Sequence, residues 1–317
     1  MPFVPDLEHA LRALFQCSNR HRKMAVPQTG RHLAVAFLLC AGTLCFGPAQ
    51  AQPVPPLIAL DVGHYMDKPG ATSARGLTEY SFNRALVGAV DSRLRESGLR
   101  TELIGGDGLA ADLAARPRRA REAGALLFLS VHHDSARERF LRNWEYEGQP
   151  RKYLDDRFQG FSLFVSRQNP QWRQALDCAS ALGAQLRAAG FKPSRYHADP
   201  LLGEAREFAD EANGVHFFDN LAVLRNATIP ALLFEAGVIV NRDEEARLNT
   251  DATRARIAAA VDLAMPTCVT QANKALGAPV HAATTAPSTA PRGGARARNP
   301  GNPGHPARAL AAPAALK

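Results

Sequence analysis

The sequence predicts a single α/β domain with a mostly parallel, twisted sheet and helices on both faces. Between residues 57 and 265, short apolar segments alternate with segments of helical periodicity. The apolar run at residues 125–131 is continuous, as expected for a strand buried on both faces in the middle of a sheet. Strands that alternate with helices are typical of parallel sheets covered on both sides.

The first half of this region divides clearly into elements. Apolar runs predict strands, and apolar residues at helical spacing predict helices. Thr78 is a suitable N-cap for one helix, and Gly98 follows its end. In order, we expect a strand at 57–61, a helix at 79–96, a strand at 100–104, a helix at 111–122 and a strand at 125–131.

The second half is less regular. Residues 136–159 are charged and aromatic and predict an insertion or a long loop, and residues 197–218 are polar and receive no assignment. The remaining elements are a strand at 160–166, a helix at 171–189, a strand at 231–234 and a helical region at 243–264, expected in two pieces.

The N-terminus has the features of a secretory signal. Basic residues precede an apolar run at 33–46, and Ala49-Gln50-Ala51 then supplies small residues at the positions a signal peptidase requires. The run is shorter than the ~20 residues of a membrane span. We therefore predict export to the periplasm, with residues 1–51 as an N-terminal extension and signal peptide, and no stable membrane insertion after cleavage. Met24 is an alternative start, and an uncleaved anchor is the alternative to cleavage.

The net charge of +8 is concentrated at the two ends. Residues 1–51 carry +3 and residues 266–317 carry +6, which leaves −1 for the part between them. A near-neutral folded part argues against nucleic-acid binding. We read 52–56 as a linker, 57–265 as the catalytic domain and 266–317, rich in Ala and Pro, as a disordered basic tail.

Cys178 and Cys268 are the cysteines that remain after cleavage. Export makes a disulfide between them chemically feasible. Spacing alone does not show that their Cα atoms approach closely enough. Two unpaired thiols are therefore the expectation.

Polar residues follow three apolar strands of the predicted sheet. The first strand runs into Asp61-Val62-Gly63-His64, the third into Ser130-Val131-His132, and the last into Glu235. Ligands of open α/β sheets bind at the carboxyl ends of the strands. If these strands are parallel and adjacent, His64, His132 and Glu235 meet at one edge.

This set of residues predicts a hydrolytic zinc site. Such a site needs three protein ligands and one open position for water. His64 and His132 supply two, and Glu79 can supply the third because a 15-residue connection can return its carboxylate to the strand end. Interaction with the helix dipole is the alternative for Glu79. Glu235 is the candidate general base, and a buried ion pair with an arginine is its alternative.

Other residues near these strands compete for the same roles. His133 is the rival of His132, and since adjacent strand residues point to opposite faces, one of the two is expected at the metal. Asp61 is expected to support His64 or to cap the turn. We expect His197 and His216 at the surface or in the substrate groove.

In these residues the chain resembles the zinc-dependent N-acetylmuramoyl-L-alanine amidases, the family that includes the cell-division amidases. The motifs that carry the resemblance occur in the family's order across residues 57–265. They are Asp61-Val62-Gly63-His64, Glu79 with Asn83, Ser130-Val131-His132-His133-Asp134, Gly160-Phe161-Ser162-Leu163-Phe164, Val223-Leu224-Arg225, Pro230-Ala231-Leu232-Leu233-Phe234-Glu235-Ala236-Gly237, and Asn241. The departures, such as Val62, Tyr65-Met66 and Asp134, affect the groove more than the ligands.

The resemblance implies Zn²⁺ held by His64, Glu79 and His132, with Glu235 catalytic. It implies cleavage of the peptidoglycan amide bond between N-acetylmuramic acid and L-alanine, with Asn83, Arg225 and Asn241 as substrate-binding residues. It also makes a protein activator a candidate partner. Acids within 197–218 could cover the zinc in a resting state, namely Glu204, Glu207, Asp210 and Glu211.

Two other functions use the same features. A zinc carboxypeptidase acting on stem peptides would use the same ligands, and only its products would differ. A degenerate amidase that binds peptidoglycan without cutting it would have lost a ligand or Glu235, and all four residues are present.

Overall fold

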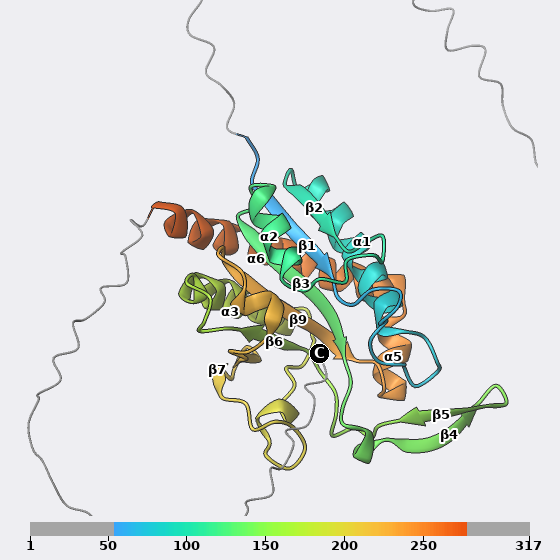
Figure 1. The fold of residues 1–317 in the computed structure, drawn as a ribbon. Helices are drawn as coiled ribbons and strands as arrows, with labels where there is room; N and C mark the ends of the chain where they lie inside the picture. The colour runs from blue at the N-terminus through green and yellow to red at the C-terminus, as the bar shows by residue number, and fades with distance from the viewer. Residues whose placement is uncertain (1–53, 278–317) are drawn as a thin grey trace, which may run out of the picture. The chain divides into compact units, whose positions relative to one another are not determined.

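A computed structural model describes residues 54–277. These residues form a seven-stranded sheet with helices on both faces (Figure 1). In spatial order the strands are β2 (Arg100–Ile104), β1 (Leu57–Val62), β3 (Leu127–Asp134), β9 (Ala231–Val238), β6 (Ser162–Val165), β8 (Val215–Phe217) and β7 (Phe208–Asp210). Four pairings are parallel, while β6–β9 and β7–β8 are antiparallel. The predicted fold class is confirmed.

Each face of the sheet packs against its own helices because side chains alternate along a strand. Ile58 and Leu60 belong to the core beneath α1 (Glu79–Glu96), α3 (Trp172–Ala188) and α6 (Asp251–Gly277). Leu57 and Ala59 belong to a second core on the opposite face, beneath α2 (Ala115–Glu122) and α4 (Ala222–Arg225). The short helix α5 (Arg242–Leu248) follows β9 directly.

The predicted insertion at 136–159 contains secondary structure of its own. It begins with a 3-10 turn, η1 (Glu138–Phe140), and continues as an antiparallel hairpin of β4 (Arg142–Tyr146) and β5 (Gln149–Tyr153). The hairpin extends away from the main sheet (Figure 1). The polar segment 197–218 contains a second 3-10 turn, η2 (Tyr196–Ala198), and the two edge strands β7 and β8.

The prediction that a disordered tail begins at residue 266 is wrong. Helix α6 continues through Pro266 to Gly277. Cys268, Ala272 and Ala275 are buried, and they extend the helical spacing of the buried residues before them. Composition alone hid this pattern, because small residues rather than large apolar ones form the buried face. The predicted signal peptide and the rest of the tail lie outside the described residues, which contain no helix long and apolar enough to cross a membrane.

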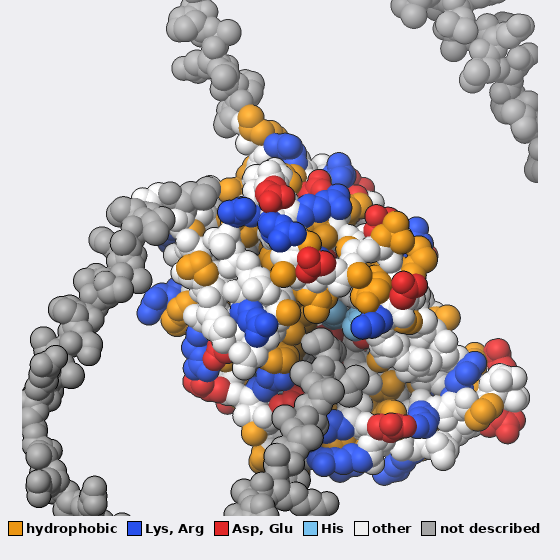
Figure 2. Space-filling model, in the orientation of Figure 1, with side chains coloured by type: hydrophobic (Ala, Val, Ile, Leu, Met, Phe, Trp, Pro, Cys, Tyr) orange, Lys and Arg blue, Asp and Glu red, His pale blue; other side chains and the backbone are white. Residues whose placement is uncertain are grey.

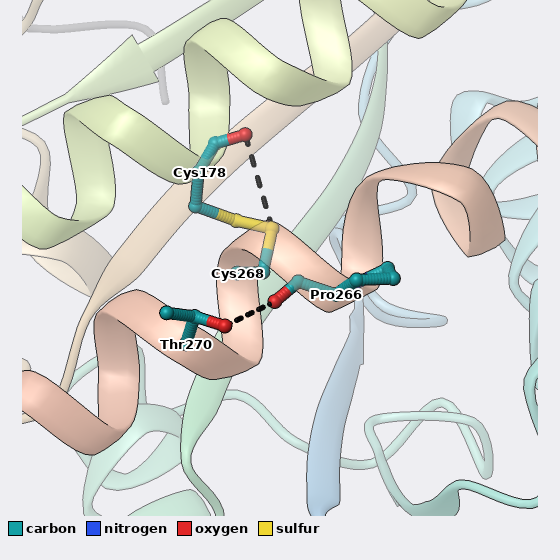
Figure 3. Close-up of a disulfide and its surroundings, with 4 residues drawn as sticks. All are labelled: Cys178, Pro266, Cys268 and Thr270. Atoms are coloured by element: carbon teal, nitrogen blue, oxygen red, sulfur yellow. Dashed lines mark hydrogen bonds between the residues drawn. A yellow bond between two sulfur atoms is a disulfide. The ribbon is translucent and has the colours of Figure 1, made fainter.

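A disulfide joins α3 to α6 (Figure 3). Cys178 and Cys268 lie 90 residues apart in sequence, and their Cα atoms are 4.5 Å apart. The expectation of two unpaired thiols is therefore wrong. It failed because the close approach depends on the packing of two helices that the sequence does not place side by side.

Removal of this disulfide should lower stability without altering the fold. In the chain-entropy account, a crosslink that closes a long loop lowers the entropy of the unfolded chain, and this typically raises the free energy of unfolding by about 2–4 kcal/mol. We expect the double variant Cys178→Ser/Cys268→Ser to lose about this much free energy of unfolding, measured by urea denaturation. Dithiothreitol should destabilise the wild type by a similar amount and leave the double variant unchanged. Equal urea midpoints for all samples would contradict the structural role.

Candidate metal centre

Three strands bring their carboxyl ends to one edge of the sheet. β1, β3 and β9 are adjacent and parallel, as the strand-end argument required. His64 follows β1, His132 lies near the end of β3, and Glu235 is its register partner on β9. Register partners on adjacent strands carry their side chains on the same face, about 4.8 Å apart. His132 and Glu235 therefore stand side by side on the face that α2 and α4 cover.

Glu79 reaches the same place from α1. The connection from β1 folds back so that the Glu79 N–H donates to the carbonyl of Ala71 (2.8 Å), and Thr78 caps the helix that Glu79 begins. One carboxylate oxygen of Glu79 lies 2.9 Å from Nε2 of His64, and the other lies 3.0 Å from Nδ1 of His132. The carboxylate thus bridges the two imidazoles.

These three residues have the arrangement of a metal site. One potential ligand atom from each lies within 4.8 Å of the other two. The backbone passes so close that a Cβ atom at Gly63 would collide with the His132 ring, and one at Gly70 would collide with Glu79. The side chain of Glu79 is 1% exposed and that of His64 is 17% exposed, so the cluster opens to solvent on the side of His64. Figure 2 shows exposed histidine surface on the face of the molecule that it displays. Two imidazoles and one carboxylate fit a hydrolytic zinc ion.

A buried ion pair lies behind His64 and was not predicted from the sequence. Asp61 accepts a hydrogen bond from Arg116 (2.7 Å) and another from the hydroxyl of Ser130 (2.6 Å). Asp61 therefore contacts this guanidinium rather than the ring of His64. Arg116 sits in a helix rich in Arg and Ala, where nothing in the sequence distinguishes it from the exposed Arg119.

His133 does not compete for the metal. Its ring lies on the α1 face of β3, where Nδ1 is 2.8 Å from Oδ1 of Asn83. Asn83 itself is fully buried, and its amide donates to the carbonyl of Gly63 (3.1 Å). The assignment of Asn83 to substrate binding is therefore wrong. Its two amide atoms connect α1 with the ends of β1 and β3, and its burial keeps it from a substrate in the groove.

Asn241 is a helix cap rather than a substrate ligand, which corrects a second assignment. Its Oδ1 accepts hydrogen bonds from the N–H groups of Asp243 (3.1 Å) and Glu244 (3.0 Å), and its amide donates to the carbonyl of Phe158. The side chain is 3% exposed because α5 begins immediately after β9. From the sequence alone, a polar residue after the last strand could either bind substrate or cap the next helix, and Asn241 caps the helix.

Arg225 is exposed at the end of α4, which packs against α2 and β9. Its role in substrate binding stays a prediction.

A second polar network lies beyond Glu235, on the same side of the sheet. Asp134, at the end of β3, accepts hydrogen bonds from Tyr196 and His197, the latter at 2.6 Å, and His197 also contacts Glu204 at 3.0 Å. Burial lowers the pKa of His197, but the two carboxylates outweigh burial and raise the pKa to about 9. His197 is therefore protonated at neutral pH and holds its loop to β3.

His216 lies on strand β8 and is fully buried. Burial, followed by the positive charges of His197 and Arg206, lowers the pKa of His216 to about 3, so its ring is neutral. His197 is also buried, which makes the expectation of two surface or groove histidines wrong. Both rings pack against Phe164, an apolar contact that the polar surrounding sequence concealed.

The acids expected to cover the zinc are all engaged with other partners. Glu204 pairs with His197, and the other three contact Arg167, Asn213 and Arg195, respectively. The expectation of a resting-state cover from this segment is therefore not met, because local partners take up each carboxylate.

Comparisons with known proteins agree with the family that the sequence motifs indicated, and they identify solved structures with the same α/β fold. Residues 58–266 match the family model described as N-acetylmuramoyl-L-alanine amidase. A search of curated proteins finds no match.

Three solved structures are similar to the chain. They are Ami1 from Mycobacterium smegmatis (TM-score 0.54, 19% identity, 68% of this chain and 98% of that chain), the N-acetylmuramoyl-L-alanine amidase from Clostridium difficile 630 (0.52, 14%, 67% and 96%) and the CwlD amidase from Clostridioides difficile in complex with the GerS lipoprotein (0.50, 17%, 68% and 99%). At these identities the likeness establishes the fold.

The family model covers most of the sheet and helices and every residue of the candidate centre. This chain therefore belongs to the N-acetylmuramoyl-L-alanine amidase family, whose members hydrolyse peptidoglycan.

Proposed function

We propose that this chain is an exported, zinc-dependent amidase that uses His64, Glu79 and His132 as metal ligands and Glu235 as its general base. The observation that carries the proposal is the meeting of three ligand atoms within 4.8 Å of one another, one of them on His132, the register partner of Glu235 on the adjacent strand. Family membership supplies the bond that is cut, between N-acetylmuramic acid and L-alanine.

The three ligands have distinct positions in the fold. His64 leaves the end of β1, His132 is rigidly placed within β3, and Glu79 enters from the first turn of α1. Zn²⁺ bound by these residues would polarise the scissile carbonyl and lower the pKa of a bound water to ~7. Because His64 is partly exposed, solvent can reach the cluster from this side, as a hydrolytic zinc site would require.

Glu235 is suited to move a proton. Its side chain is 1% exposed and stands beside that of His132 on the adjacent strand, so a water held at the cluster would lie close to it. We expect Glu235 to accept the proton of that water and to deliver it to the nitrogen of the leaving L-alanine. An acid placed after four apolar strand residues is costly to bury unless it is hydrogen-bonded, ion-paired or used in catalysis, and we propose the last of these for Glu235.

Two observations support export, and a third supports a protein partner. Peptidoglycan lies outside the cytoplasm, and the Cys178–Cys268 disulfide suits an oxidising compartment such as the periplasm. CwlD, which shares the fold, is in complex with a lipoprotein, and we propose that a protein partner also regulates this chain.

Glu235→Gln should abolish hydrolysis while leaving zinc binding intact. The amide keeps the shape of the side chain but cannot accept the proton, so we expect a rate at least ~100-fold lower. The measurement is mass spectrometry of products released from purified peptidoglycan. The exposed Glu122 provides a matched control, since Glu122→Gln should retain the wild-type rate.

The products of this assay also separate the competing functions. Release of intact stem peptides supports the amidase. Cleavage within the stem peptide would identify a carboxypeptidase instead, and binding without any product would identify a non-catalytic module.

Metal removal should reversibly inactivate the wild type. We expect dialysis against a chelator to abolish product release and about one equivalent of zinc per chain to restore it. His132→Gln should hold less zinc after dialysis than the wild type, measured by atomic emission. His133→Gln is the control, because the neighbouring ring lies on the opposite face of β3 and should leave the zinc content close to that of the wild type. Equal zinc contents in the two variants would contradict the assignment of ligands.

A further inference from the structure

Arg116 is a fully buried arginine at the start of α2, 2% exposed. A guanidinium group has five N–H donors, and burial is costly unless each one finds an acceptor. Here all five are used. They donate from Nε to the carbonyl of Ala110 (3.0 Å), from Nη1 to Asp61 Oδ1 (2.7 Å) and the carbonyl of Val62 (2.6 Å), and from Nη2 to the carbonyls of His64 (2.5 Å) and Ala110 (2.6 Å).

Two of these acceptors flank the turn that carries a proposed zinc ligand. The carbonyls of Val62 and His64 both point at Arg116, while Gly63 between them donates its N–H to the carbonyl of Val131 (3.0 Å). On the opposite side, Asn83 donates to the carbonyl of Gly63 (3.1 Å). The backbone of residues 62–64 is therefore held from both sides.

This restraint matters because His64 adopts an unfavourable backbone conformation. Its φ is 67°, in the left-handed region that residues other than glycine rarely occupy. Such a conformation persists only where surrounding contacts determine it. It also aims the imidazole at Glu79, since Nε2 lies 2.9 Å from the Glu79 carboxylate.

The charge of Arg116 is balanced by that of Asp61. Asp61 pairs with Nη1 and is itself fixed by the Ser130 hydroxyl on β3. The guanidinium therefore adds no uncompensated positive charge beside a cation site. Its planar fork reaches several carbonyls at fixed angles, which the single ammonium group of lysine cannot reproduce.

We propose that Arg116 is a positioning residue for His64. By holding the carbonyls on either side of Gly63, it keeps His64 in the left-handed conformation that points its ring at the metal, and so raises the metal affinity of the site. This inference rests on the proposed zinc site.

The test is the zinc affinity of Arg116→Lys in the full chain, measured by competition with a chelator of known affinity. Loss of a group that orients a ligand typically weakens metal binding by about 10–100-fold, and we expect a loss in this range. With Co²⁺ in place of Zn²⁺, the visible absorption bands should shift, since they report ligand geometry and not stability.

Two controls separate positioning from stability. Arg119→Lys changes an exposed arginine on the same helix, paired with Glu102, and should keep wild-type affinity. Leu182→Ala removes a buried side chain of α3, on the other face of the sheet, and shows how much affinity falls when only stability falls. The inference would be overturned if Arg116→Lys bound zinc as tightly as the wild type. It would also be overturned if Arg116→Lys lost no more zinc affinity than Leu182→Ala when the two variants lose the same free energy of unfolding.

If Arg116→Lys does not fold, Asp61→Asn provides the second variant. It removes the charge that orients the guanidinium and should weaken zinc binding by about 10-fold, and unchanged affinity would again overturn the proposal. Failure of the zinc site itself is distinguishable, because in that case the wild type would bind no zinc.

Discussion

The carboxylate of Glu79, placed between two imidazoles, is the contact around which the functional edge of the sheet is organised. It requires β1 and β3 to be adjacent and parallel, and it requires the intervening loop to turn back to the start of α1. Glycines at positions 63 and 70 allow the backbone to approach the ligand side chains closely. Because these conditions are met together, one narrow region contains three groups that could hold a metal ion, and a second carboxylate, that of Glu235, lies one strand away.

The supporting structure of the site is mostly polar and buried. Arg116 and Asp61 hold the turn at His64 from one side, and Asn83 holds it from the other. Beyond Glu235, the pair of Asp134 and His197 attaches the following loop to the end of β3. Buried polar groups of this kind are costly unless they are fully hydrogen-bonded, and when they are satisfied they specify one arrangement. The site is thus fixed by buried hydrogen bonds that hold its turns to the strands and helices.

The errors of sequence reasoning share one physical origin. Asn83 and Asn241 follow the right elements in the right order, but their amides are consumed by neighbouring backbone groups rather than presented to substrate. Cys178 and Cys268 pair because α3 and α6 pack together, and the same packing carries α6 past Pro266. A polar or small residue can serve several structural or functional roles, and which role it has depends on the residues that surround it in the folded chain.

Local periodicity and capping were enough to predict the alternation of strands and helices, the helix from Glu79 to Glu96 and the polar residues at the strand ends, because these features depend on neighbours along the chain. Three features became evident only in the folded chain: β1, β3 and β9 are neighbours, His132 rather than His133 faces Glu79, and Arg116 is buried behind His64. Each of these depends on contacts between segments tens of residues apart, and the hydrogen bonds that settle them form only when the sheet is assembled.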